Sequence, residues 1–351
     1  MSSSIFSSET VRRYGALPRK ERLWHAAIAV AAAIAVLVCR EIPPRLYGTS
    51  GCRGGSLGST AVASLSDRTE LLFAGSSHVL FGVRPQRFTI PAMNLAGTWL
   101  DYTCIRAVIA KHLHRVPNLK VAVIEYDELP YVSDLVPAMI ATRDVRPLQE
   151  LGLSPAEFPT AGAAQTAEVY ATNFMFPFTG LPRVTPRAWA DRDKTCSPLY
   201  HPPRGFAPGY YYTDGVTPEN FDAGAVFNAL ARASRKVNVV RRNEAALTET
   251  IALLRSRGTA VVLLRLPHAR GYVPQRPPIV SARFRELQRI ALAASRADAS
   301  IAVWDFAEHP AFDPADFVDN NHLNAAGADK LAKLLDAPLR ALASKTVAEV
   351  R

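Results

Sequence analysis

Two stretches of the sequence carry residues whose types and spacing could do chemistry. The first is Gly75-Ser76-Ser77-His78, directly after the short apolar segment 70–74. A serine on a strand-to-helix turn is exposed, with its backbone N–H at a helix start, which suits both nucleophilic attack and oxyanion binding. The second is 317–324 (FVDNNHLN), where Asp319 precedes His322 by three positions. Such an Asp can accept from one ring nitrogen of the His, so that the other nitrogen faces a serine hydroxyl as base.

Each stretch also has a purely structural interpretation when it is taken alone. Gly-Ser-Ser is common as a turn or helix cap, and Asp-x-x-His ahead of a helix is a common capping arrangement. The chemical interpretation is favoured only if both stretches lie at the carboxyl ends of strands in one parallel sheet, where reactive groups gather.

The apolar pattern predicts such a sheet. Short, largely apolar segments indicate strands at 70–74, 120–125, 259–266 and 301–306. Apolar residues at helical spacing indicate helices at 98–116, 243–257, 279–296 and 325–343. Alternating strands and helices with apolar strands are typical of a parallel α/β sheet covered on both faces. We therefore expect one α/β domain over 69–343, interrupted by a Pro- and aromatic-rich insertion at about 130–225 that forms a cap or partner surface.

The amino-terminal region predicts a membrane anchor. Residues 23–39 are 17 residues without a formal charge, and the basic residues before them outnumber those after. We expect a cytoplasmic tail at 1–22, a transmembrane helix at 23–39, a linker at 40–68, an exported domain and a tail at 344–351. A cleaved signal peptide and a buried Ala-rich helix are the alternatives.

Composition excludes several classes of protein. Ordinary charge content and 9% aromatic residues exclude a disordered or collagenous chain. The net charge of +10 is spread without a basic block, and no finger spacing or basic stripe is present, so nucleic acid is not expected as a partner. Four cysteines without close spacing indicate neither a zinc site nor a framework of bridges, although one disulfide could form after export. We expect no metal and no cofactor.

Gly75-Ser76-Ser77, together with Asp319-x-x-His322-Leu323-Asn324-x-x-Gly327, resembles the SGNH (GDSL-like) hydrolase superfamily. The likeness covers about 69–128 and 235–340 and is greatest to the anchored branch of D-alanylation and alginate O-acetylation proteins. It implies a three-layer, flavodoxin-like SGNH fold and a triad of Ser77 as nucleophile, His322 as base and Asp319 as its orienting partner. It also implies oxyanion donors, for which Ser77 and Gly97 are the candidates.

The sequence departs from that pattern after the segment 120–125. Members of the superfamily supply a second oxyanion donor from an Asn there, whereas this chain has Tyr126-Asp127-Glu128. Three further residues are candidates for substrate contact, with the alternative that each is only a structural or surface residue: His78, His268 and Arg270.

The resemblance implies an O-acyltransferase or esterase acting on a cell-envelope polysaccharide through an acyl-enzyme. The domain would lie on the periplasmic side of the cytoplasmic membrane, with a multi-spanning membrane acyltransferase as a partner that delivers the acyl group. The alternative is a non-catalytic envelope module of the same fold that binds glycan or that partner.

Overall fold

The computed structural model describes residues 61–98, 100–135, 148, 151–153, 158 and 223–349. The predicted anchor at 23–39 lies outside these residues, as does most of the insertion predicted at about 130–225. In the described ranges, no helix is both long enough and apolar enough to cross a membrane.

The centre of the fold is a parallel sheet of five strands in the order β2-β1-β3-β4-β5. The strands are β1 Leu71–Ala74, β2 Ala92–Asn94, β3 Val121–Glu125, β4 Ala260–Arg265 and β5 Ile301–Asp305. The four predicted strands are confirmed within a residue at each end. Strand β2 was not predicted, because three residues are too few to show a pattern. The order reverses between β1 and β3, which makes their carboxyl ends the place where a crevice forms in doubly wound sheets.

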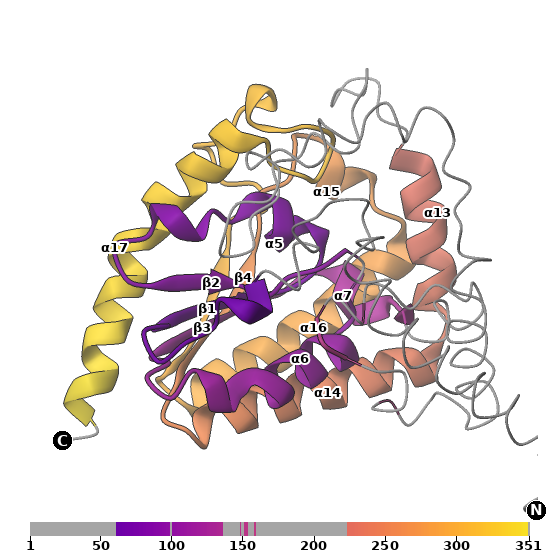
Figure 1. Ribbon diagram of the computed structural model, residues 1–351. Coiled ribbons are helices and arrows are strands. Elements are labelled where there is room, and N and C mark those ends of the chain that lie inside the picture. The colour runs from indigo at the N-terminus through magenta and orange to yellow at the C-terminus, as the bar shows by residue number, and fades with distance from the viewer. Residues whose placement is uncertain are drawn as a thin grey trace, which may run out of the picture.

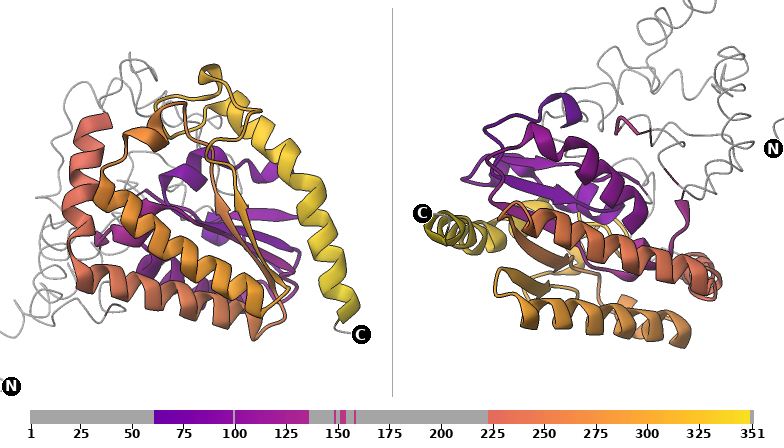
Figure 2. Two further views of the ribbon diagram at one scale, coloured as in Figure 1. Left: turned by 180° about the vertical axis from the view of Figure 1, so that it is seen from behind. Right: turned by 90° about the horizontal axis from the view of Figure 1, so that it is seen from below.

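Helices cover both faces of the sheet (Figures 1 and 2), so the architecture has three layers. One face carries α6 Tyr102–His112, α7 Glu128–Val132, α13 Ala223–Ser234, α14 Val237–Arg255 and α16 Pro278–Ala297. The other face carries α5 Ser77–Gly82 and α17 Ala325–Glu349. Four short helical turns lie between these elements: η1 Pro85–Arg87, η2 Leu113–Arg115, α15 Tyr272–Gln275 and η5 Pro314–Asp316.

The strands contribute side chains to two separate hydrophobic cores, one on each face of the sheet. Leu71 and Phe73 of β1 pack with α5 and α17, whereas Leu72 and Ala74 pack with the helices of the opposite face. This alternation follows from the two-residue period of a strand, and burial on both faces explains why the strands read as continuous apolar segments.

The structure corrects three of the predicted boundaries. The helix expected at 98–116 begins at Tyr102, where the Asp101 carboxylate accepts from Cys104 N–H at 2.9 Å. The last helix continues through 344–349, which were expected to be a tail, even though it contains Pro338. The linker expected at 40–68 ends earlier, because Ala61 and Leu65 are buried in the core.

Candidate active site

Ser77 lies at the turn that joins β1 to α5. Strand β1 ends at Ala74, Gly75 and Ser76 form the turn, and Ser77 is the first residue of the helix. Ser76 is the N-cap, and its hydroxyl accepts from His78 N–H at 3.4 Å. Gly75 has no room for a side chain, because a Cβ there would lie 2.5 Å from Val79 Cγ2. The glycine therefore permits the tight passage from strand to helix that places Ser77 at the sheet edge.

His322 lies in the loop between β5 and α17, and Asp319 organises that loop. One oxygen of the Asp319 carboxylate accepts from the backbone N–H groups of Asn321 at 2.9 Å and His322 at 2.8 Å. An isolated antiparallel bridge between Phe317 and Leu323 closes the loop around them. The Asp-x-x-His spacing thus forms a turn that holds its own histidine, as the sequence predicted.

The folded chain brings Ser77, His322 and Asp319 into one hydrogen-bonded chain. The Nε2 atom of His322 lies 2.9 Å from Ser77 Oγ, and its Nδ1 lies 2.8 Å from the second oxygen of Asp319. Because the carboxylate can only accept, the proton of the neutral ring sits on Nδ1 and the lone pair of Nε2 faces the serine hydroxyl. This is the arrangement that allows an imidazole to take a proton from a serine.

The electrostatics of this chain suit a base that is neutral at neutral pH. Burial lowers the pKa of His322 below its usual value, although the hydrogen bond to and the charge of Asp319 work in the opposite direction. Burial alone would raise the pKa of Asp319, but hydrogen bonds from the His322 ring and from two backbone N–H groups outweigh burial and lower it. The imidazole is therefore unprotonated and the carboxylate ionised near pH 7.

Among the described residues, an acceptor engages one of the two predicted oxyanion donors but not the other. The backbone N–H of Gly97 donates to the carbonyl of Gly75 at 3.1 Å, so it is already engaged and that assignment needs correction. No acceptor within the described part of the chain pairs with the backbone N–H of Ser77. The place of the expected Asn after β3 is taken by Tyr126-Asp127-Glu128, whose acidic side chains are buried.

The structure also corrects the predicted substrate contacts. His78 is 2% exposed and His268 is 5% exposed, so neither presents a surface to a substrate. The Nε2 atom of His268 lies 2.8 Å from the Asp127 carboxylate, and its ring stacks on Tyr272. Arg270 alone among the three candidates is exposed.

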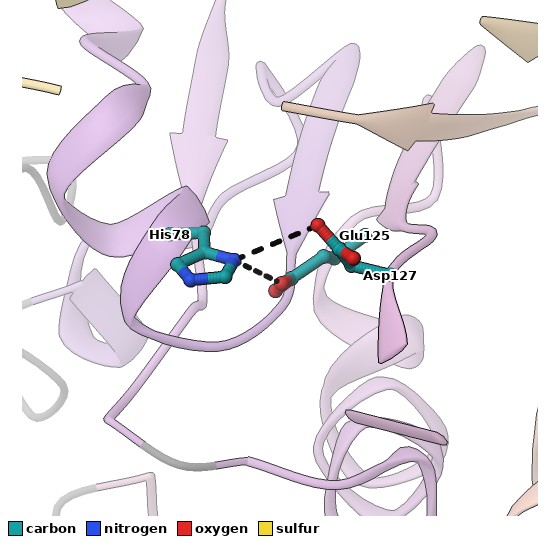
Figure 3. A group of neighbouring side chains, drawn as sticks. All are labelled: His78, Glu125 and Asp127. Carbon is teal, nitrogen blue, oxygen red and sulfur yellow. Dashed lines mark ion pairs between the residues drawn. The ribbon is translucent and has the colours of Figure 1, made fainter. Parts of the chain in front are cut away.

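Behind the triad lies a buried network of charged groups that the sequence analysis did not assign. His78 Nδ1 lies 3.1 Å from Glu125 and 3.8 Å from Asp127 (Figure 3). Its other members join the carboxyl ends of β3 and β4 to α15: Glu128, Arg265, His268 and Arg276. Burial and the nearby Asp127 raise the pKa of Glu128 to about 7, against the opposing effect of the two guanidinium groups.

A signal for this network was present in the sequence. Glu125 ends the otherwise apolar strand VAVIE, and Arg265 is the only charge within TAVVLLRL. Charged residues inside fully buried strands are almost always paired, because an isolated buried charge is very costly. These two residues at the carboxyl ends of adjacent strands therefore indicated a buried ion pair network beside the serine turn.

Comparison of the chain with models of known protein families and with curated proteins finds no match to either.

Proposed function

We propose that this chain is a serine O-acyltransferase or esterase that acts through a covalent acyl-enzyme on Ser77. The observation that carries the proposal is the hydrogen-bonded chain from Ser77 through His322 to Asp319 at the carboxyl edge of the parallel sheet. Nucleophilic acyl transfer requires a serine hydroxyl next to a neutral imidazole that a carboxylate orients, and this site has that arrangement.

The geometry supports the following steps. Ser77 Oγ attacks the carbonyl carbon of an ester and its proton passes to His322 Nε2, giving a tetrahedral oxyanion. Collapse breaks the bond to the leaving alcohol, which takes the proton from His322, and leaves the acyl group on Ser77. An acceptor hydroxyl or water then attacks the acyl-enzyme and passes its proton to His322. Collapse of this second tetrahedral species breaks the bond to Oγ, and Oγ recovers the proton. Asp319 holds the ring and stabilises its charged form throughout.

The acceptor class comes from the resemblance to the anchored SGNH branch. We propose an ester-linked acyl group on a cell-envelope polysaccharide, with the domain held on the periplasmic side of the membrane by residues 23–39. Tethering would raise the effective concentration of the domain near a multi-spanning acyltransferase partner.

A second candidate is a non-catalytic module of the same fold. The engaged N–H of Gly97 and the acidic residues in place of the expected Asn favour it, because they leave Ser77 N–H as the single assigned oxyanion donor. Loss of one such donor costs about 10²–10³ in rate in serine hydrolases. A binding module would keep the triad geometry without an activated serine.

A fluorophosphonate probe separates the two candidates, because it phosphonylates a serine only when that serine is activated. The full chain is labelled, and the adduct is located by intact mass and peptide mapping. We expect labelling at Ser77 that disappears in Ser77→Ala and falls sharply in His322→Ala. The matched controls are Ser344→Ala and His114→Ala, which replace exposed side chains elsewhere and should label as the wild type does. Folded protein that takes up no probe would overturn the enzyme proposal and leave the binding module.

A further inference from the structure

The imidazole of His78 is buried between the triad and two carboxylates. Its Nδ1 atom lies 3.1 Å from Glu125 and 3.8 Å from Asp127, and both acids are completely buried. On its other side, its ring centroid lies 5.1 Å from that of His322. Figure 3 shows that the second ring nitrogen of His78 is turned away from both carboxylates. His78 is therefore the group that separates the acidic network from the catalytic histidine.

Glu125 depends on His78 for its compensating charge. Among the described residues, no Arg or Lys forms an ion pair with Glu125, whereas Ser76 donates to it through both its N–H and its hydroxyl. An ionised carboxylate that is fully removed from water requires a cation or several strong donors. The ring nitrogen at 3.1 Å supplies that cation only when His78 is protonated.

Asp127 differs from Glu125 because its carboxylate contacts both a neutral partner, His268, and a cationic one, Arg265. His268 Nε2 donates to Asp127, and burial followed by the charge of Arg265 lowers the pKa of His268 well below its usual value. His268 is therefore a neutral donor and adds no positive charge. Arg265 lies 3.7 Å from Asp127 but also pairs with Glu128 and Asp305. The charge of Asp127 is therefore only partly compensated by Arg265 and can attract a protonated His78.

The protonated form of His78 is the stable one in this environment. Burial alone would lower its pKa, but the close approach and charge of Glu125, followed by the charges of Asp127 and Glu128, raise it to about 9. The titratable and charged groups that surround His78, from the ends of β3 and β4, from α15 and from the loop before α17, are Glu125, Asp127, Glu128, Arg265, His268, Arg276 and His322.

We propose that the imidazolium of His78, fixed by Glu125 and Asp127 behind the Ser77–His322 pair, is a positioning charge that keeps His322 unprotonated and ready to act as base. A second positive charge on His322 would be repelled by the first at a ring separation of 5.1 Å. His78 touches no substrate and acts through His322. This inference rests on the proposed acyl transfer for its functional consequence but not for the charge state of His78.

A bound divalent cation is the competing explanation of the same cluster. One ligand atom each from His78, Glu125 and Asp127 lies within 4.8 Å of the others, close enough to surround an ion. A proton is favoured because the carboxylate oxygens already accept from Ser76 and His268, and because the Arg265 guanidinium lies 3.7 Å from Asp127. A divalent metal would place two positive charges beside that guanidinium, whereas a proton on Nδ1 adds only one and pairs directly with Glu125.

The charge state is tested on the wild-type chain by ¹⁵N NMR of labelled histidine. The chain has eight histidines, and those with ordinary pKa values lose their charge below pH 8. We expect one imidazolium to persist at pH 8 and to titrate near pH 9. Its absence overturns the proposal without the need for a variant. Elemental analysis that finds one tightly bound divalent metal per chain also overturns it.

The effect on His322 is tested by the pH dependence of the rate of fluorophosphonate labelling. In His78→Gln the repulsion is lost while Glu125 remains, so His322 should hold its proton to higher pH. We expect the ratio of the labelling rate at pH 5 to that at pH 8 to fall relative to wild type, by up to about threefold if the pKa of His322 rises by half a unit. In the double variant His78→Gln/Glu125→Gln the opposing charge is also removed, and the ratio should return toward the wild-type value.

A purely structural role for His78 would lower the labelling rate equally at both pH values and would not be reversed by the second substitution. Unchanged ratios in a labelled, folded His78→Gln chain would sink this inference alone. His114→Gln, an exposed histidine distant from the network, is the matched control and should leave the ratio unchanged. Absence of labelling in the wild type would instead sink the acyl-transfer proposal and leave the NMR result standing.

Discussion

Ser76 and Glu125 are joined by two hydrogen bonds across neighbouring strands. The backbone N–H of Ser76 donates to one oxygen of the carboxylate, and its hydroxyl donates to the other at 2.9 Å. Glu125 ends β3, which pairs with β1 in register, so the turn that carries Ser77 is fastened to the next strand of the sheet. The turn that positions the Ser77 hydroxyl is thus held, through Ser76, by a residue 49 positions further along the chain than Ser76.

The first prediction concerns that fastening. Glu125→Gln has the same shape but replaces one accepting oxygen with an NH₂ group, so only one donor of Ser76 keeps an accepting oxygen and the charge that strengthens both bonds is lost. We expect the free energy of unfolding to fall by about 1.5–3 kcal/mol, the usual range for a buried hydrogen bond to a charged group. Denaturant unfolding of the full chain measures this change, with Glu249→Gln, an exposed glutamate on α14, as the control. Equal stability of both variants would contradict the assigned bonds.

The second prediction concerns the orientation of His322. Asp319→Asn keeps one oxygen for the backbone N–H groups of the loop, but its NH₂ group can no longer accept from Nδ1. The ring then favours the tautomer with its proton on Nε2, which cannot take the proton of Ser77. We expect the labelling rate at Ser77 to fall by about a thousandfold or more while the loop remains folded. A labelling rate within about tenfold of wild type would show that Asp319 is only a loop residue.

The third prediction is the pH dependence of labelling in the wild type. The pKa of His322 is lowered in the folded chain, so the base is lost only when the pH falls below its ordinary value of 6.5. We expect a labelling rate that is constant from about pH 7 to pH 8 and declines below pH 6.5. A rate that still rises steeply between pH 7 and pH 8 would indicate a base with a raised pKa and would contradict the environment described.

The fourth prediction concerns Glu128, whose pKa is raised from 4.5 to about 7. The native state binds this proton more tightly than the unfolded state does, so its contribution to stability is full below pH 4.5 and is lost as the pH rises to about 7. Glu128→Gln resembles the protonated form and does not undergo this loss. We expect the variant to match wild type at pH 4 and to exceed its free energy of unfolding by a few kcal/mol at pH 8.

Unfolding curves of wild type and Glu128→Gln at several pH values measure that difference. Arg276 Nη1 donates to the Glu128 carboxylate at 2.9 Å, and the amide oxygen of glutamine can accept the same bond. A variant that is less stable than wild type at pH 8 would show that the charge of Glu128 is needed by Arg265 and Arg276.

The fifth prediction compares two glycines at the same edge of the sheet. A Cβ on Gly75 would lie 2.5 Å from Val79 Cγ2 and 2.6 Å from a carboxylate oxygen of Glu125, closer than real atoms approach. A Cβ on Gly97 would meet Leu100 and Leu151 at 3.4 Å, an ordinary contact. We expect Gly75→Ala to cost about 1–3 kcal/mol of stability and to displace Ser77, with Gly97→Ala close to neutral. Similar effects of both would contradict the tight turn.

Local chemistry explains which features could be predicted from the sequence. The turn at Asp319 and His322 is held by bonds within a few residues, so its spacing alone indicated an oriented histidine. Residues 71–74 and 121–124 are continuous apolar segments because both faces of their strands are buried. Strand β2 and helix α15 are too short to show a periodic pattern of apolar residues, and contacts with neighbouring elements stabilise them.

The sequence determined by itself that a Ser turn and an Asp-His loop follow apolar strands, because patterning and short-range hydrogen bonds are local properties. Only the tertiary structure decided that Ser77 and His322, 245 positions apart, lie 2.9 Å from each other. It also decided that Gly97 N–H is engaged and that His78 lies among acids rather than in a pocket. Strand order and sheet register set those distances, and they depend on long-range pairing that no local pattern encodes.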